Sequence, residues 1–103
     1  MVLLFASIKN TSPKKQSVSV IIPAYNEEPT VGQVVSTALK LSYVDEVIVV
    51  DDGSTDSSGK ICDDYAERYP DRIKVIHKKN GGLASARNAG LKIASAEYVF
   101  FLD

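Results

Sequence analysis

The sequence lacks several features that would place it in large classes of proteins. It has a single cysteine, Cys62, so no disulfide can form within the chain. One cysteine fits a reducing compartment, so we expect a cytoplasmic location, with the inner face of the membrane as an alternative place of action. No apolar run approaches the roughly 20 residues of a membrane-spanning helix. The short apolar start at residues 1–6 also lacks the charged and hydrophobic regions of a signal peptide.

An excess of charge of one sign is missing as well. The net charge is −1, from 12 lysines and arginines against 13 aspartates and glutamates. This balance argues against a strongly basic surface, so we expect no nucleic-acid partner. The hydrophobic content of 45% is typical of a globular domain, and 103 residues are enough for one core.

Familiar nucleotide and hydrolase signatures are also absent. No Gly-x-Gly-x-x-Gly segment follows the first expected strand, which disfavours a dinucleotide-binding domain, and there is no Walker A loop. A phosphatase of the haloacid dehalogenase type needs Asp-x-Asp-Gly after a strand, whereas Gly53 comes one residue too early. No cluster of cysteine and histidine suggests zinc.

What the sequence does contain is organised around residues 47–56. Four branched apolar residues, 47–50, predict a fully buried parallel strand. Two carboxylates follow it, and ligands of open α/β sheets bind at the carboxyl ends of strands, so Asp51 is expected to point into that crevice. The alternative is an ordinary strand-to-helix turn, because Asp, Gly and Ser are common turn residues. This stretch alone leaves both interpretations open.

The apolar periodicity predicts four strands that alternate with three helices. We expect strands over residues 18–22, 46–50, 73–76 and 98–102, and helices over residues 31–41, 57–69 and 83–94. This order predicts an α/β fold, a Rossmann-like parallel sheet with helices on both faces. Residues 1–17 are interpreted as a flexible leader and residues 18–103 as the domain.

The last expected strand is wholly apolar and should lie at a sheet edge or beside missing strands. An unprotected apolar edge invites pairing with another chain, so we expect a homo-oligomer formed through residues 98–102. For the same reason we expect the chain to be the front part of a longer protein.

Polar groups that could hold a nucleotide follow three of these strands. Tyr25 offers an aromatic face, Asp51 can accept a hydrogen bond from a ring N–H, and Arg87 can donate to a carbonyl or phosphate. Gly82 would let backbone amides approach the ligand at a helix N-terminus, and Asp103 can reach a ribose hydroxyl or a divalent cation. Each residue also has a purely structural interpretation, as a surface tyrosine, a solvated arginine or a terminal aspartate. Their convergence on one sheet edge favours a site.

Two further residues are interpreted as structural only. His77 reads as the end of the third strand, with no nucleophile to pair with. Asp63 lies in the middle of a helix and is expected to be solvated.

Four segments in order carry a family resemblance: residues 20–27, 49–56, 80–90 and 98–103. With them, residues 17–103 resemble the amino-terminal half of a GT-A glycosyltransferase of family 2. The resemblance implies transfer of a sugar, with inversion, from a nucleotide-diphosphate-sugar, most often UDP-linked. The implied acceptor is a hydroxyl of a carbohydrate, lipid-linked or protein molecule, and the implied cofactor is a divalent metal, Mn²⁺ or Mg²⁺.

The resemblance also implies a set of donor-binding residues. They are Pro23, Ala24, Tyr25, Glu27 and Asp51 around the base and ribose, with Asp52, Gly82, Arg87 and Asp103 completing the site. Asp103 matches the first Asp of the Asp-x-Asp metal motif, so it is the expected metal ligand. The second Asp of that motif and the general base of the family would lie beyond residue 103. We therefore expect this chain to contain no catalytic residue and to be inactive alone.

Two other functions stay open on the sequence. The first is a catalytically dead nucleotide-binding or interaction module, which would share all four segments. The second is a nucleotidyltransferase, which would need a glycine-rich basic loop after the first strand, and residues 23–27 are neither.

Overall fold

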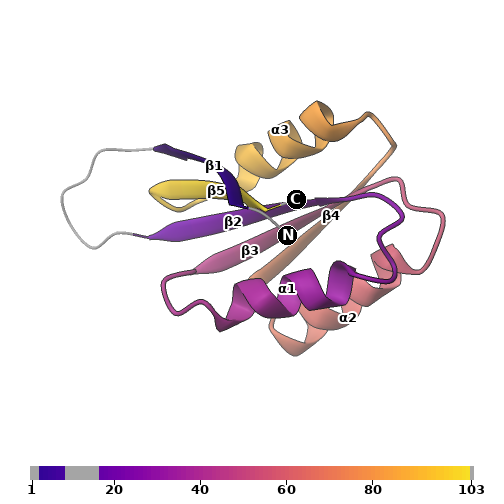
Figure 1. Cartoon of the computed structure of the whole chain (residues 1–103), viewed down its shortest axis with the longest axis horizontal. Coiled ribbons are helices and arrows are strands. Elements are labelled where there is room, and N and C mark those ends of the chain that lie inside the picture. Colours follow the sequence, from indigo (N-terminus) through magenta and orange to yellow (C-terminus); the bar gives the residue numbers. More distant parts are fainter. Residues whose placement is uncertain (1–2, 9–16, 103) are drawn as a thin grey trace.

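A computed structural model describes residues 3–8 and 17–102 of the chain (Figure 1). Five strands form one sheet in the order β1-β5-β2-β3-β4. Strands β2 to β5 are parallel, whereas β1 runs antiparallel to β5. The elements are β1 (Leu3–Ile8), β2 (Val18–Ala24), α1 (Val31–Lys40), β3 (Glu46–Asp52), α2 (Ser58–Arg68), β4 (Ile73–Lys78), α3 (Leu83–Ile93) and β5 (Tyr98–Leu102).

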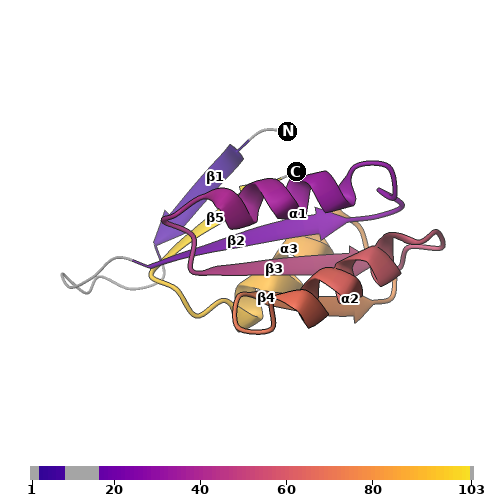
Figure 2. The same cartoon turned by 90° about the horizontal axis from the view of Figure 1, so that it is seen from below.

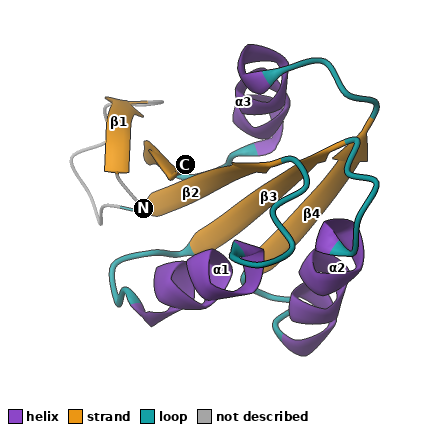
Figure 3. Cartoon of the chain, turned by 45° about the vertical axis from the view of Figure 1, so that its right-hand side comes forward, coloured by secondary structure: helices purple, strands orange, loops and turns teal. Residues whose placement is uncertain are grey.

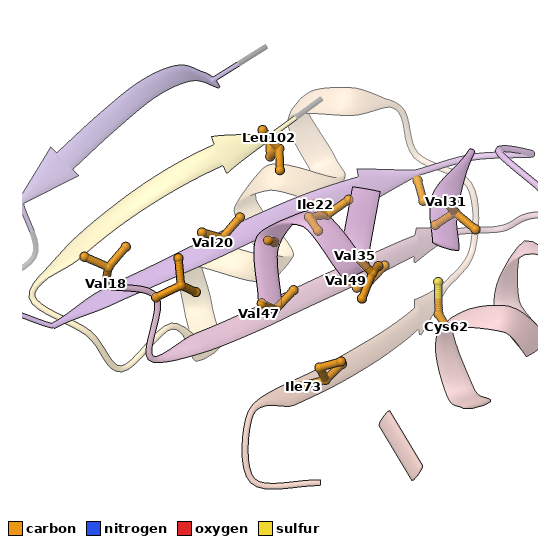
Figure 4. Close-up of a cluster of buried hydrophobic side chains, with 13 residues drawn as sticks. Val18, Val20, Ile22, Val31, Val35, Val47, Val49, Cys62, Ile73 and Leu102 are labelled. Carbon is orange, nitrogen blue, oxygen red and sulfur yellow. The ribbon is translucent and has the colours of Figure 1, made fainter. Parts of the chain in front are cut away.

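Helices cover both faces of the sheet, which confirms the predicted fold class. Helices α1 and α2 lie on one face and α3 on the other (Figure 3). Alternate residues of a strand point to opposite faces, and β3 divides accordingly. Val47 and Val49 pack with Val35 of α1 and Cys62 of α2 (Figure 4), whereas Ile48 and Val50 pack in the second cluster, with Ala86 of α3.

Three strands run further than expected, and one of them, β4, continues to Lys78 instead of ending at Ile76. Pro23 was predicted to end the first strand, but β2 continues to Ala24 and pairs there with Asp51. A proline lacks an N–H and is tolerated where a strand has a neighbour on only one side. The pairing of β2 with β5 stops at Ile21, so Pro23 meets this condition. Strand β3 likewise extends through Asp52 instead of ending before its two carboxylates.

The expected flexible leader over residues 1–17 is wrong for residues 3–8, which form β1. The backbone of β1 pairs with β5 from Leu3↔Leu102 to Ile8↔Tyr98 (Figures 1 and 2). Strand β5 therefore lies between β1 and β2 and is not an open edge. The physical reason is that an apolar strand with unpaired N–H and C=O groups gains hydrogen bonds from a further strand. The exposed edge that predicted self-association through residues 98–102 is not found.

Glu46, at the amino end of β3, ties several elements together away from the strand ends that carry the motifs. Its carboxylate accepts hydrogen bonds from the Ser19 hydroxyl, from the Ser95 N–H at 2.8 Å and from Lys74 Nζ at 3.0 Å. Burial alone would raise the pKa of Glu46, but the bonds from Ser19, Ser95 and Lys74 outweigh it and lower this pKa to about 2. The Glu46 carboxylate is therefore ionised, and its role is structural.

Within residues 3–8 and 17–102, no helix has the length and apolar character needed to cross a membrane. The lone thiol of Cys62 is fully buried. Burial raises the pKa of this thiol to about 12, with the charges of Asp51 and Asp63 adding to the effect. Cys62 is therefore an inert core residue.

Candidate functional site

A cavity of about 620 Å³ opens at the carboxyl ends of β2 and β3, between the first turns of α1 and α3. Most of the predicted site residues line it: Pro23, Ala24, Tyr25, Glu27, Asp52 and Gly82. Tyr25 is 49% exposed and Leu83, also in the wall, is 50% exposed. The cavity thus has apolar surface open to a ligand, at the sheet edge where α/β proteins bind theirs.

Asp51 lies beside this cavity and is not part of its lining. The Asp51 side chain is 9% exposed. Its Oδ1 accepts a hydrogen bond from the Ser54 N–H at 3.0 Å, and its Oδ2 lies 2.8 Å from Nδ1 of His77. Burial opposes the charged form, but the bonds from Ser54 and His77 prevail and lower the pKa of Asp51. Asp51 is therefore ionised and hydrogen-bonded through both of its oxygens.

His77 is bound on both sides, which sequence reasoning missed. Its Nε2 lies 2.7 Å from Oδ1 of Asp63, so the ring bridges two carboxylates. The hydrogen bonds to Asp51 and then to Asp63 raise the pKa of His77. Asp63, expected to be simply solvated, has this bond although its side chain is 57% exposed. The only signal that could have revealed the pair is the register of β3 and β4, which sets Asp51 opposite His77.

Asp52 points to the other face and fastens the loop between β4 and α3. Its Oδ1 accepts from the Gly81 N–H at 3.0 Å and from Lys78 Nζ at 2.8 Å, and its Oδ2 accepts from the Gly82 N–H at 2.9 Å. The bond from Lys78, aided by those from the two amides, lowers the pKa of Asp52. The expectation that the amides at Gly82 approach a ligand is wrong for the Gly81 and Gly82 N–H groups, because a neighbouring strand supplies their acceptor. Gly82 still lines the cavity.

A latch holds the β2–α1 loop against the β3–α2 loop and sets one wall of the cavity. Asn26 Oδ1 accepts from the N–H groups of Thr55 at 2.8 Å and Asp56 at 3.3 Å, and its own N–H donates to Ser54 Oγ at 2.9 Å. Asn26 has φ of +49°, a conformation that asparagine tolerates better than most residues. Further bonds join the loops: Glu27 N–H to Ser58 Oγ, Glu28 N–H to Asp56 Oδ2 and Ser57 N–H to Glu28 Oε1. Much of the hydroxyl-rich motif after β3 is thus structural.

Of the last two predicted residues, Arg87 is not part of the cavity wall. Arg87 is half-buried on α3, with its guanidinium carbon 5.5 Å from the centre of the Phe101 ring. Asp103, the predicted metal ligand, lies outside the described residues. Across residues 17–102, no three His, Cys, Asp or Glu side chains come together in a way that could hold a metal ion. These residues do not form a metal site by themselves.

Comparison with known proteins assigns the family. The profile of glycosyl transferase family 2 matches residues 19–103. The chain belongs to glycosyltransferase family 2. It is 48% identical over 87 residues to the uncharacterized glycosyltransferase EpsJ of Bacillus subtilis, a match that covers 84% of this chain and 25% of EpsJ. It is 42% identical over 88 residues to the minor teichoic acid biosynthesis protein GgaB of the same organism, covering 82% of this chain and 10% of GgaB.

Solved structures confirm the GT-A fold. S. aureus TarS (residues 1–349) in complex with UDP-GlcNAc has a TM-score of 0.74 and 36% identity, covering 84% of this chain and 26% of that one. The mannosyltransferase PcManGT from Pyrobaculum calidifontis, in complex with GDP-Man and Mn²⁺, has a TM-score of 0.72 and 29% identity, covering 88% and 30%. The chain therefore spans between 10% and 30% of the length of these four chains.

Proposed function

We propose that this chain is the donor-binding part of a glycosyltransferase that moves a sugar from a UDP-sugar to an acceptor hydroxyl with inversion. The proposed acceptor is a carbohydrate, lipid-linked or protein hydroxyl, in the synthesis of a cell-envelope polysaccharide. The reaction would take place on the cytoplasmic side of the membrane.

The observation that carries this proposal is the cavity at the carboxyl ends of β2 and β3. The cavity volume of about 620 Å³ suits a small-molecule ligand. Its wall combines an exposed aromatic ring with polar groups of the β2–α1 loop and of the β4–α3 loop. S. aureus TarS and the glucosyl-3-phosphoglycerate synthase of Mycobacterium tuberculosis, both similar in fold, are known in complex with UDP-GlcNAc and UDP-Glc. PcManGT binds GDP-Man, so the choice of uracil for this chain is part of the proposal.

The proposal gives each residue a role in holding the donor. Tyr25 stacks on the base, because its half-exposed ring lies in the cavity wall. Asp51 accepts the ring N–H in addition to its bonds from Ser54 and His77. Arg87 donates to the base or the phosphates, and Glu27 faces the ribose side of the cavity.

Catalysis would need groups outside residues 17–102. The two cavity carboxylates are Glu27 and Asp52, and Asp52 is engaged by Lys78 and two amides. The side chains of residues 17–102 do not fit a metal site, so Mn²⁺ or Mg²⁺ would need ligands outside them, with Asp103 as one. We expect the 103-residue chain to bind the donor and not to transfer the sugar.

The experiment is a calorimetric titration of the chain with UDP, GDP, CDP and dTDP. UDP should bind most tightly, and Asp51→Asn should weaken it. Asp64→Asn is the matched control, because Asp64 is exposed on α2 and pairs with Lys60 away from the cavity. Absence of binding by every nucleotide, or equal effects of the two variants, would overturn the proposal. Sugar transfer by the 103-residue chain would overturn its claim of inactivity.

A further inference from the structure

The contact that stands out beside the cavity is the bridge Asp51–His77–Asp63, which runs from β3 through β4 to α2. Both ring nitrogens of His77 lie within hydrogen-bond distance of a carboxylate oxygen, at 2.8 and 2.7 Å. A carboxylate only accepts, so both contacts are hydrogen bonds only when the ring carries both protons. The bridge is therefore an imidazolium held between two carboxylates.

We infer that His77 is a positioning residue that holds the Asp51 carboxylate in the orientation that receives the donor base, while Asp63 anchors the ring from the far side. This inference rests on the proposed role of Asp51. With Oδ1 fixed by the Ser54 N–H and Oδ2 fixed by the ring, the carboxylate cannot rotate about its last bond. A preorganised acceptor binds its partner more tightly, because the orientation is set before the ligand arrives.

The packing around the ring supports this role. Gly59 of α2 lies directly over the pair, and a Cβ there would come within 2.7 Å of Asp51 Oδ2 and 3.3 Å of His77 Cε1. The helix thus approaches the bridge so closely that no side chain fits between them. The charged groups that face the ring are Asp51 from β3 and Asp63 from α2. Cys62 of α2, near both carboxylates, is a neutral thiol because its pKa is about 12.

The proposal makes donor binding depend on the charge of the ring. The bonds to Asp51 and Asp63 raise the pKa of His77 above its usual value, so the doubly protonated ring and the bridge persist to a higher pH than in a free imidazole. When the pH rises through this pKa, the ring loses one proton and can donate to only one carboxylate. Asp51 is then released in the molecules whose remaining ring proton lies on Nε2. Those molecules should bind UDP roughly tenfold more weakly, the effect of one lost orienting bond to a charged group, so the apparent affinity falls in proportion to their share.

The test is a UDP titration across this pH range with two variants. The unaltered chain should lose affinity as pH rises, and His77→Ala should bind weakly at all pH values. Asp63→Asn should keep the UDP affinity high at every pH. The amide of this variant can donate to Nε2 of the neutral ring while Nδ1–H still donates to Asp51. If His77 only stabilised the fold, Asp63→Asn would not keep the UDP affinity high as the pH rises. Equal affinities and pH profiles in all three proteins would overturn the inference.

A second readout separates this inference from the proposed function. The Ser54 amide donates to Asp51, so its NMR chemical shift should follow the titration of the His77 ring and lose that response in His77→Ala. If UDP does not bind, the proposed function fails, and the Ser54 resonance still decides whether His77 orients Asp51. A Ser54 shift that ignores the ring titration would overturn the positioning role even if UDP binds.

Discussion

Replacement of Asn26 should show how strongly the contact between the β2–α1 and β3–α2 loops depends on one side chain. Asn26→Ala removes the oxygen that accepts from the N–H groups of Thr55 and Asp56. It also places an alanine at φ of +49°, where a Cβ without a polar group is unfavourable. Asn26→Gly removes the same hydrogen bonds but relieves the backbone, so the two variants separate the two effects.

The magnitude follows from these contacts. The two lost bonds are solvent-exposed, so each contributes about 0.5–1 kcal/mol, the lower part of the usual range for a net hydrogen bond. An alanine at positive φ adds about 1 kcal/mol relative to glycine. Asn26→Ala should therefore lower the free energy of unfolding by about 2–3 kcal/mol, and Asn26→Gly by about 1–2 kcal/mol.

The assay is urea unfolding followed by circular dichroism, with the slope m compared among the proteins. The control is Asn88→Ala, which makes the same chemical change at an exposed position of α3 and should leave stability unchanged or slightly higher, because alanine favours a helix. Surface substitutions usually change the free energy of unfolding by no more than about 0.5 kcal/mol. If Asn26→Ala stays within this range of the unaltered chain, the Asn26 hydrogen bonds do not stabilise the fold. If Asn26→Gly is the less stable of the two, the backbone part of the reasoning is wrong.

Four further predictions concern other parts of the molecule. Gly59→Ala should destabilise the fold by about 1–3 kcal/mol and weaken UDP binding, because the new Cβ meets Asp51 Oδ2 at 2.7 Å. Gly32→Ala, whose Cβ would lie 3.5 Å from the nearest side-chain atom, should stabilise by up to about 1 kcal/mol in the same urea assay. The pKa of Glu46 is about 2 in the fold against 4.5 normally, so stability should be lost as the pH falls from 4.5 towards 2; acid titrations by circular dichroism should show a smaller loss in Glu46→Gln. Tyr25→Ala should weaken UDP binding about tenfold in calorimetry, whereas Tyr25→Phe should retain it; equal affinities would exclude stacking.

The sequence predicted the parts of the fold that depend on local pattern. Runs of branched residues located the buried strands, and helical periodicity located α1, α2 and α3 to within one residue at each end. Pro23 was misread as a terminator, because the cost of a proline depends on whether a neighbouring strand needs its N–H. Strand β1 was missed, because its pairing with β5 joins residues almost a whole chain length apart.

For the site, too, local sequence predicted some features and not others. Six of the nine residues predicted for the site line the cavity, since parallel strands end at one edge, but Asp51 and Arg87 do not. Their partners depend on register and loop contacts that local sequence does not encode. Examples are His77 against Asp51, the Gly82 N–H against Asp52, and Asn26 against Thr55. Each of these joins residues more than 25 positions apart, so no local pattern could show it.

The central claim is that the cavity between α1 and α3 holds a nucleotide diphosphate. The most direct measurement is a map of backbone amide NMR shifts as UDP is added to the ¹⁵N-labelled chain. We predict saturable shifts at Tyr25, Glu27, Asn80 and Gly82, which line the cavity, and none at Glu97, which is buried at the opposite end of the sheet. Shifts confined to that opposite end, or no saturable shifts at any amide, would contradict the account.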